Sequence, residues 1–157
     1  MKIITWNVNG IRAVEKKGEL HNLLRDEQPD VLYLQEIKGN REQFSEFLSD
    51  NDDYEIFYHS AEKKGYAGTG IWLQREFAKK LKNVEFSIEI PKAPNADEGR
   101  LSQLSFKLGR NQYELLSIYF PNGGKSEEAW EEKLRFYAHT LDYMNQMAGQ
   151  GCIVIVG

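Results

Sequence analysis

Two short apolar segments constrain the fold of this chain more than any other feature of its sequence. Residues 31–35 (VLYLQ) are apolar up to the final glutamine, and residues 152–156 (CIVIV) are apolar throughout. A strand that is apolar on both faces is typical of a sheet that is covered on both sides. We therefore expect a layered fold of helices and sheets in which both segments are internal strands.

The other strands and the first helices follow from apolar spacing and from the residues that end each run. Helical spacing of leucines before Pro29 predicts a first helix, and Phe44, Phe47 and Leu48 mark a second. Further strands are predicted at residues 2–8, 54–59, 69–74, 84–90, 101–108 and 113–120, and alternation in the last three favours antiparallel pairing. The pattern predicts a single α+β domain over 157 residues.

The clearest helical pattern follows Ser126, which is a suitable N-cap with Glu127 and Glu128 in the first turn. Apolar side chains then recur in steps of four and three residues, at Trp130, Leu134, Tyr137, Leu141, Met144 and Ala148. We interpret this stripe as a core-packing face and not as a cofactor-binding surface.

Composition restricts the function classes without naming a partner. The chain contains no apolar run near the ~20 residues that a membrane span needs. One cysteine excludes an internal disulfide, and the first residues lack a signal-peptide pattern, so we expect a cytoplasmic, reducing environment. The net charge of −4 does not indicate a nucleic-acid partner, but it does not exclude one, because a local cluster of basic residues is enough to bind nucleic acid.

Polar residues at the ends of the first two predicted strands are the first candidates for a functional site. Glu36 follows VLYLQ, where a carboxylate can reach a crevice and bind a hard cation such as Mg²⁺. Asn7 and Asn9 alternate along the end of the first strand, so both side chains point the same way. The alternatives are an exposed strand-end glutamate and an ordinary Asn-Gly turn.

Two later segments carry hydrogen-bond donors suited to phosphate. In YFPNGG, Tyr119 ends a strand and Asn122 lies in a turn, where both could donate to a phosphate oxygen. In DEGR, Arg100 could hold a carboxylate or a phosphate with two parallel hydrogen bonds. The alternatives are a core tyrosine with a loop asparagine, and a surface turn with a local ion pair to Glu98.

The order of these motifs resembles the exodeoxyribonuclease III and apurinic/apyrimidinic endonuclease family, within the exonuclease-endonuclease-phosphatase superfamily. The resemblance rests on WNVNGIRA, LQEIK, KKGYAGTG, DEGR and YFPNGG, and it extends from residue 2 to residue 157. It implies a four-layer α-β-β-α sandwich, with mixed, mostly antiparallel sheets and flanking helices. It also implies a Mg²⁺-dependent hydrolase of DNA repair, with Mn²⁺ as an alternative metal, that cuts abasic-site duplex DNA and removes nucleotides from 3′ ends.

Residue by residue, the resemblance implies specific roles. Glu36 would bind the metal with support from Asn7, and Asn7 and Tyr119 would serve catalysis. Asn122, Asn9 and Arg100 would contact phosphate or DNA.

The resemblance also implies that part of the site lies outside residues 1–157. In the family, a strand like CIVIVG runs into Gly-Asp-x-Asn, and a Ser-Asp-His segment follows later, whereas Gly157 is the last residue here. We therefore expect the N-terminal half of the sandwich, a partial domain that is weakly active or inactive alone. Its uncovered apolar sheet face would favour self-association or a complementary C-terminal half.

The three histidines, His21, His59 and His139, are interpreted as structural or surface residues. Two alternative functions stay open from the sequence. One is a non-catalytic remnant that binds nucleic acid or protein, and the other is a phosphoesterase of the same superfamily with a different substrate.

Overall fold

The computed structural model describes residues 1–88 and 96–157, whose strands form two four-stranded sheets. The first sheet has the order β1-β2-β4-β3, with strands Ile3–Asn7 (β1), Val31–Gln35 (β2), Tyr54–His59 (β3) and Thr69–Gln74 (β4). The second has the order β5-β6-β7-β8, with strands Lys82–Ser87 (β5), Leu101–Leu108 (β6), Asn111–Ile118 (β7) and Ile153–Val156 (β8).

Pairing within the sheets is mixed and mostly antiparallel. Among the described strands, β1 with β2 and β7 with β8 are parallel, and the other four pairs are antiparallel. The predicted fold class, mixed sheets with flanking helices, is confirmed. The end of the strand predicted at 84–90 lies outside the described residues.

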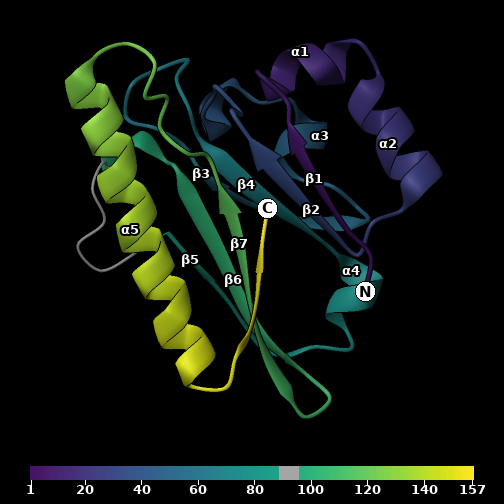
Figure 1. The fold of residues 1–157 in the computed structure, drawn as a ribbon. Coiled ribbons are helices and arrows are strands. Elements are labelled where there is room, and N and C mark those ends of the chain that lie inside the picture. Colours follow the sequence, from purple (N-terminus) through teal and green to yellow (C-terminus); the bar gives the residue numbers. More distant parts are fainter. Residues whose placement is uncertain (89–95) are drawn as a thin grey trace.

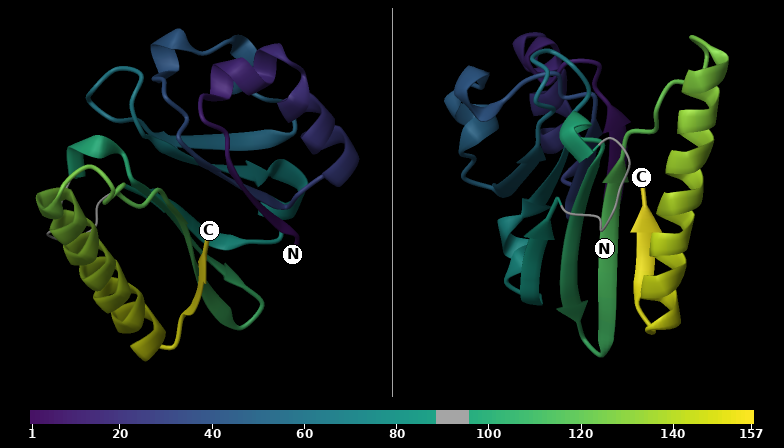
Figure 2. Two further views of the ribbon diagram at one scale, coloured as in Figure 1. Left: turned by 45° about the horizontal axis from the view of Figure 1, so that its top comes forward. Right: turned by 90° about the vertical axis from the view of Figure 1, so that its left-hand side faces the viewer.

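Helices cover the outer face of each sheet (Figures 1 and 2). The first sheet carries the helices Ile11–Lys16 (α1), Glu19–Glu27 (α2) and Glu46–Ser49 (α3), with the 3₁₀ turn Arg41–Gln43 between β2 and α3. The short helix Arg75–Ala78 (α4) follows β4, and the 3₁₀ turn Ala96–Glu98 precedes β6. The long helix Glu127–Gly149 (α5) covers the second sheet, and the Ser126 hydroxyl caps it by accepting the amide of Ala129 at 3.2 Å.

The inner faces of the two sheets pack against each other. One buried cluster joins side chains of the first sheet, such as Tyr33 and Ile71, to side chains of the second, such as Leu104 and Leu115. The chain crosses to the second sheet after α4, so it supplies both β-layers of the sandwich itself. The expectation that one apolar sheet face would stay uncovered is therefore wrong. Each sheet has two edge strands with one neighbouring strand among the described residues, β1 and β3 in the first sheet and β5 and β8 in the second.

Helix α5 does not bury the stripe that its sequence pattern favours. Five of the six stripe residues are exposed: Ala148, and Trp130, Leu134, Tyr137 and Leu141 with exposed fractions of 50%, 49%, 42% and 54%. The sheet is covered instead by a neighbouring face of the helix, formed by Phe136, Thr140, Tyr143 and Met147, and Met144 is the one stripe residue that packs with them. The prediction was wrong because the helix has two apolar faces, and spacing does not reveal which one meets the sheet.

Strand β8 also departs from expectation. Ile153 and Val156 are 39% and 42% exposed, because β8 lies at an edge of its sheet beside α5 and not in its interior (Figure 2). By contrast, every residue of β2 is buried, as its sequence predicts. Within the described residues, no helix is both long and apolar enough to cross a membrane.

Polar side chains link the two sheets near the carboxyl end of β2. Gln35 donates from Nε2 to the Ser117 hydroxyl at 2.8 Å, and that hydroxyl donates to the carbonyl of Leu34 at 3.1 Å. The hydroxyls of Thr69 and Ser102 form a second link at 2.8 Å. These buried contacts fix the relative position of the sheets beside the residue that follows β2, which is Glu36.

Candidate active site

The backbone around Glu36 is held in an unusual conformation. Asn9, Glu36 and Lys38 have positive φ angles of 46°, 54° and 49°, a left-handed region that non-glycine residues rarely adopt. Hydrogen bonds hold this arrangement: the amide of Gly10 donates to the carbonyl of Glu36 at 2.7 Å, and the amide of Lys38 donates to the carbonyl of Ala67 at 3.0 Å. Such strain persists only where the surrounding structure enforces it, and it is concentrated at functional sites.

The Glu36 carboxylate receives hydrogen bonds from three side chains. The amide of Asn7 donates to Oε1 at 2.8 Å, and the ammonium of Lys38 lies 2.8 Å from Oε2. The hydroxyl of Tyr119 forms a further hydrogen bond to the same carboxylate. The fold therefore brings together Asn7, Glu36 and Tyr119, three of the residues singled out from the sequence, from β1, β2 and the segment after β7.

The surroundings of Glu36 favour its charged form. Partial burial alone would raise the pKa of this carboxyl group. The hydrogen bonds from Lys38 and Asn7, the charge of Lys38 and the hydrogen bond from Tyr119 outweigh that effect and hold the pKa below its ordinary value. At neutral pH Glu36 is therefore an anion that can attract a cation.

Lys38 is a member of the cluster that the sequence did not single out. Its ammonium bonds both to Glu36 and to the side-chain oxygen of Asn9, while the amide of Asn9 donates to the side-chain oxygen of Asn7 at 3.1 Å. In the sequence Glu36 and Lys38 flank Ile37, which is fully buried. Strand alternation does not explain this placement, because Glu36 and Lys38 both have left-handed backbone. The tertiary contacts of the segment bring the two side chains together.

Tyr119 also contacts Arg100. The guanidinium of Arg100 lies 5.0 Å from the centre of the Tyr119 ring and donates from Nη1 to the Tyr119 carbonyl at 3.2 Å. Burial, followed by the charge and hydrogen bond of Glu36, raises the pKa of the Tyr119 hydroxyl, which the charge of Arg100 partly opposes. At neutral pH the hydroxyl is therefore protonated and is a hydrogen-bond donor.

The other predicted site residues have different surroundings. Asn122 is exposed, and its side-chain oxygen accepts the amide of Gly124 at 2.9 Å, so it shapes the turn after β7. Within the described residues no hydrogen bond connects Asn122 to Glu36. Glu98 forms an ion pair with Arg100, as the ion-pair alternative anticipated, although this pair is largely buried.

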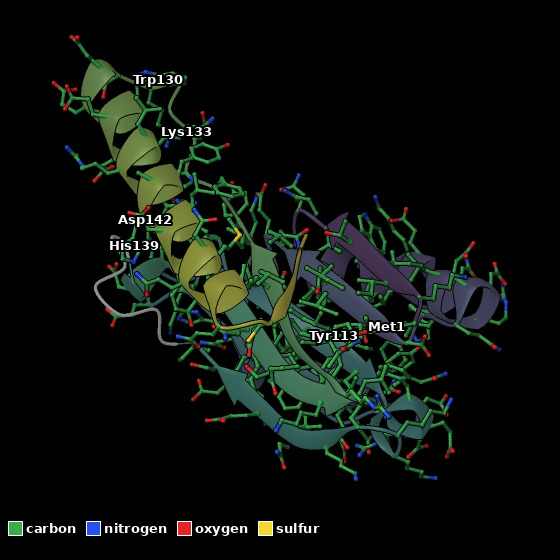
Figure 3. The ribbon with its side chains drawn as sticks, turned by 60° about the horizontal axis from the view of Figure 1, so that its bottom comes forward. Met1, Tyr113, Trp130, Lys133, His139 and Asp142 are labelled. Atoms are coloured by element: carbon green, nitrogen blue, oxygen red, sulfur yellow. The ribbon has the colours of Figure 1, made fainter. Side chains whose placement is uncertain are left out.

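The histidines lie apart from this cluster. The Nδ1 of His59 is 2.6 Å from the carbonyl of Leu101, and the ring of His21 stacks on Phe47 with centres 3.9 Å apart. His139 lies on α5 (Figure 3). Within residues 1–88 and 96–157, no group of three or more histidine, cysteine, aspartate or glutamate side chains is arranged to hold a metal ion.

The arrangement is nevertheless compatible with a magnesium ion. The Lys38 ammonium already sits between an oxygen of Glu36 and the side-chain oxygen of Asn9, so two oxygens converge on a cation. Mg²⁺ commonly binds to one or two carboxylates and takes its other ligands from water and substrate phosphate. Glu36 could therefore hold such an ion, with Asn7 orienting its carboxylate, if Lys38 moved aside.

Comparison with known proteins agrees with this geometry. Residues 4–157 match the model of the endonuclease/exonuclease/phosphatase family. An exodeoxyribonuclease of Bacillus subtilis is 33% identical over 148 residues, which cover 90% of this chain and 54% of that protein. A DNA-(apurinic or apyrimidinic site) endonuclease of Dictyostelium discoideum is 36% identical over 124 residues, which cover 79% of this chain and 31% of that protein.

Solved structures show the same fold. The AP endonuclease from Leishmania major superimposes with a TM-score of 0.76 at 27% identity, covering 93% of this chain and 48% of that one. The Xenopus laevis APE2 catalytic domain superimposes with a TM-score of 0.78 at 21% identity, covering 99% of this chain and 57% of that one. The chain thus spans about half the length of several proteins that it matches.

Proposed function

The chain belongs to the endonuclease/exonuclease/phosphatase family, and from this premise we propose that it carries one side of a metal-dependent site for DNA phosphodiester hydrolysis. The activity would be of the apurinic/apyrimidinic endonuclease and 3′–5′ exodeoxyribonuclease type. The observation that supports this proposal best is the convergence of Asn7, Lys38 and Tyr119 on the charged carboxylate of Glu36. The names of its relatives favour DNA over other phosphoesters.

Glu36 and Asn7 form the metal-binding part of the proposed site. Glu36 supplies a charged oxygen ligand, and the hydrogen bond from Asn7 to Oε1 leaves Oε2 facing Lys38 and the cation position. A bound Mg²⁺ or Mn²⁺ would stabilise the negative charge that develops on the phosphate.

Tyr119 and the two asparagines form the proposed phosphate-binding part. The Tyr119 hydroxyl is protonated at neutral pH and next to Glu36, so it can donate to a phosphate oxygen that approaches the cation. Asn122 is exposed, and its side-chain nitrogen could donate to DNA while its oxygen shapes the turn. Asn9 contributes a side-chain oxygen beside Lys38, so we assign it to the cation position more than to the phosphate.

Hydrolysis also needs a group that activates the attacking water and a group that assists the leaving oxygen. Among the described residues, no second carboxylate and no histidine contacts Glu36, Asn7 or Asn9. We therefore propose that residues 1–157 alone cleave DNA weakly or not at all. DNA binding without cleavage is the second candidate function. It is favoured because Glu36 is the single carboxylate of the proposed site among the described residues.

A complementary polypeptide would supply the other groups at the open strand edges. β1 and β8 each pair with one strand in the described part of the chain, and added strands could extend both sheets there. This partner is part of the proposal, as is the substrate, an abasic-site duplex.

Cleavage of an abasic-site duplex in Mg²⁺ tests the proposed function, with Glu36→Ala as the site variant. Glu85→Ala is a matched control, because Glu85 is an exposed glutamate of β5 at the edge of the second sheet. The proposal would be supported if the wild type cleaves the duplex weakly, or binds it without cleavage, and if this activity is lost in Glu36→Ala and kept in Glu85→Ala. Equal behaviour of all three proteins, or hydrolysis of other phosphoesters with inert abasic DNA, would refute it.

A further inference from the structure

Arg100 is the most enclosed charged side chain next to the proposed site. The residue is only 5% exposed, although it lies beside a site where DNA phosphates would bind. Its Nε bonds to the carboxylate of Glu98, its Nη1 to the carbonyl of Tyr119 at 3.2 Å, and its Nη2 to the hydroxyl of Tyr66 at 3.0 Å. Three of the five N–H groups of the guanidinium therefore have acceptors within the protein.

The backbone fixes Arg100 and Tyr119 to each other as well. The amide of Tyr119 donates to the carbonyl of Arg100 at 2.8 Å, while Nη1 of Arg100 returns a hydrogen bond to the carbonyl of Tyr119. The flat guanidinium also lies over the rings of Tyr119 and Tyr66, at 5.0 and 5.7 Å from their centres. Arg100 thus makes three contacts with Tyr119: its carbonyl accepts the Tyr119 amide, its Nη1 donates to the Tyr119 carbonyl, and its guanidinium lies over the Tyr119 ring.

Gly99 holds the segment before Arg100 close to the end of β3. Gly99 has a φ of +62°, and a Cβ atom there would lie 2.5 Å from the carbonyl oxygen of His59. Its own carbonyl accepts the buried hydroxyl of Thr69 at 3.0 Å. The backbone that carries Arg100 is therefore tightly confined, and the side chain has little freedom to turn outward.

From these contacts we propose that Arg100 is a positioning residue that holds Tyr119 against Glu36, and that it is not a phosphate ligand. Its planar, forked guanidinium reaches three acceptors and lies over two rings at once, which the single ammonium of a lysine does not. This inference rests on the proposed function, because the placement of Tyr119 matters only if Tyr119 serves the site. It replaces the direct DNA contact expected for Arg100 from its sequence motif.

Salt-dependent binding separates the two roles of Arg100. The probe is a duplex with a tetrahydrofuran abasic analogue, titrated without divalent metal at several salt concentrations. A cation that contacts phosphate contributes about one unit to the slope of log affinity against log salt. We expect Arg100→Gln to keep the wild-type slope, because the guanidinium faces protein acceptors. A slope smaller by about one unit would overturn the proposal.

The ring of Tyr119 gives a readout that needs neither DNA nor activity. Proteins with isotope-labelled tyrosine rings would be compared by NMR, with Tyr119→Phe identifying the Tyr119 signals. We expect Arg100→Gln to move or broaden these signals, and Arg110→Gln, in the exposed turn between β6 and β7, to leave them unchanged. Unchanged signals in Arg100→Gln would overturn the proposal.

Arg100→Lys keeps the positive charge and guards against loss of folding in the glutamine variant. Because lysine cannot reproduce the fork, we expect the Tyr119 signals to move in this variant as well, with a thermal transition that shows a folded protein. Tyr119 signals identical to those of the wild type in Arg100→Lys would show that a positive charge alone is enough to position Tyr119. That result would contradict positioning by the forked guanidinium.

Any measurable cleavage adds a kinetic readout. Arg100→Lys should lower kcat about tenfold or more and leave KM within about twofold, because a displaced Tyr119 disturbs the reacting geometry more than binding. A rise in KM with unchanged kcat would contradict the proposal. If the wild-type chain binds no abasic duplex, the proposed function fails, whereas the ring spectra still decide whether Arg100 positions Tyr119.

Discussion

The ammonium of Lys38 lies 2.8 Å from Oε2 of Glu36, on the carboxylate whose other oxygen accepts the Asn7 amide at 2.8 Å. The same ammonium bonds to the side-chain oxygen of Asn9. A protein cation therefore occupies the position where a metal ion would be attracted. Lys38 keeps Glu36 charged, and it must also compete with any divalent cation that binds there.

This competition predicts that Lys38→Met binds divalent metal more tightly than wild type. Removing a partly exposed ion-pair partner should raise Mn²⁺ affinity about threefold, because a nearby positive charge is lost. Calorimetric titration with Mn²⁺ measures the change. Lys107→Met, on the second sheet, is the control, and weaker Mn²⁺ binding by Lys38→Met would show that Lys38 supports the metal site.

The polar link between the sheets predicts a second effect, on stability. Ser117→Ala should lower the free energy of unfolding by about 1–3 kcal/mol, because the buried amide of Gln35 loses its acceptor. Urea denaturation gives this value. The double variant Gln35→Leu/Ser117→Ala should lose less than the sum of the two single changes, since neither partner is then left unpaired. Additive losses would contradict direct coupling.

The two apolar faces of α5 predict opposite outcomes for two substitutions. Phe136 is buried against the second sheet, so Phe136→Ala should cost about 3–5 kcal/mol of unfolding free energy. Leu141 is 54% exposed, so Leu141→Glu should change it by no more than about 0.5 kcal/mol. Figure 3 shows this helix with Trp130 and Lys133 labelled near its N-terminal end. Thermal or urea unfolding of both variants checks the assignment, which a large loss in Leu141→Glu would contradict.

Tyr54 predicts a loss of stability at alkaline pH. Burial, with smaller effects of the Asp53 and Asp30 charges, raises the pKa of Tyr54 to about 12, and its hydroxyl donates to the carbonyl of Pro29 at 3.0 Å. A raised pKa means that the folded state prefers the neutral phenol. Its contribution is complete below the unfolded-state value near 10 and is lost as pH rises from about 10 to 12, by at most about 3 kcal/mol.

Unfolding measurements between pH 9 and 12 on wild type and Tyr54→Phe isolate this effect. The stability of the wild type should fall more steeply over this range than that of Tyr54→Phe, because phenylalanine has no proton to lose. Burial also raises the pKa values of Tyr33 and Tyr58, which steepens both curves equally. Parallel curves for the two proteins would refute the assignment to Tyr54.

Much of the local structure was predictable because neighbouring residues determine it. Alternation and apolar runs gave strands at 31–35, 54–59, 69–74 and 101–108 with the bounds that the structure has. The short helices α1 and α4 were not predicted, because four to six residues seldom establish a helical period, whereas the equally short α3 was marked by Phe44, Phe47 and Leu48.

The sequence predicted several residues of the candidate site, but it did not predict which of them contact each other. Asn7, Glu36 and Tyr119 could be singled out because each follows or ends a strand in a recognisable motif. Lys38 and Tyr66 were missed, and the enclosure of Arg100 was not foreseen. Their partners are distant in sequence: Arg100 meets Tyr66 across 34 residues, and Lys38 meets Asn9 across 29.

The sequence by itself determined the strands, the capped start of α5 and the motifs that place polar groups at strand ends, because these depend on local backbone preference and on periodicity. The tertiary structure alone decided which face of α5 is buried, that one chain supplies both sheets, and that Arg100 faces Tyr119 and Glu98. Those outcomes depend on packing between segments far apart in the chain, and the spacing of residues within one segment carries no information about its partner.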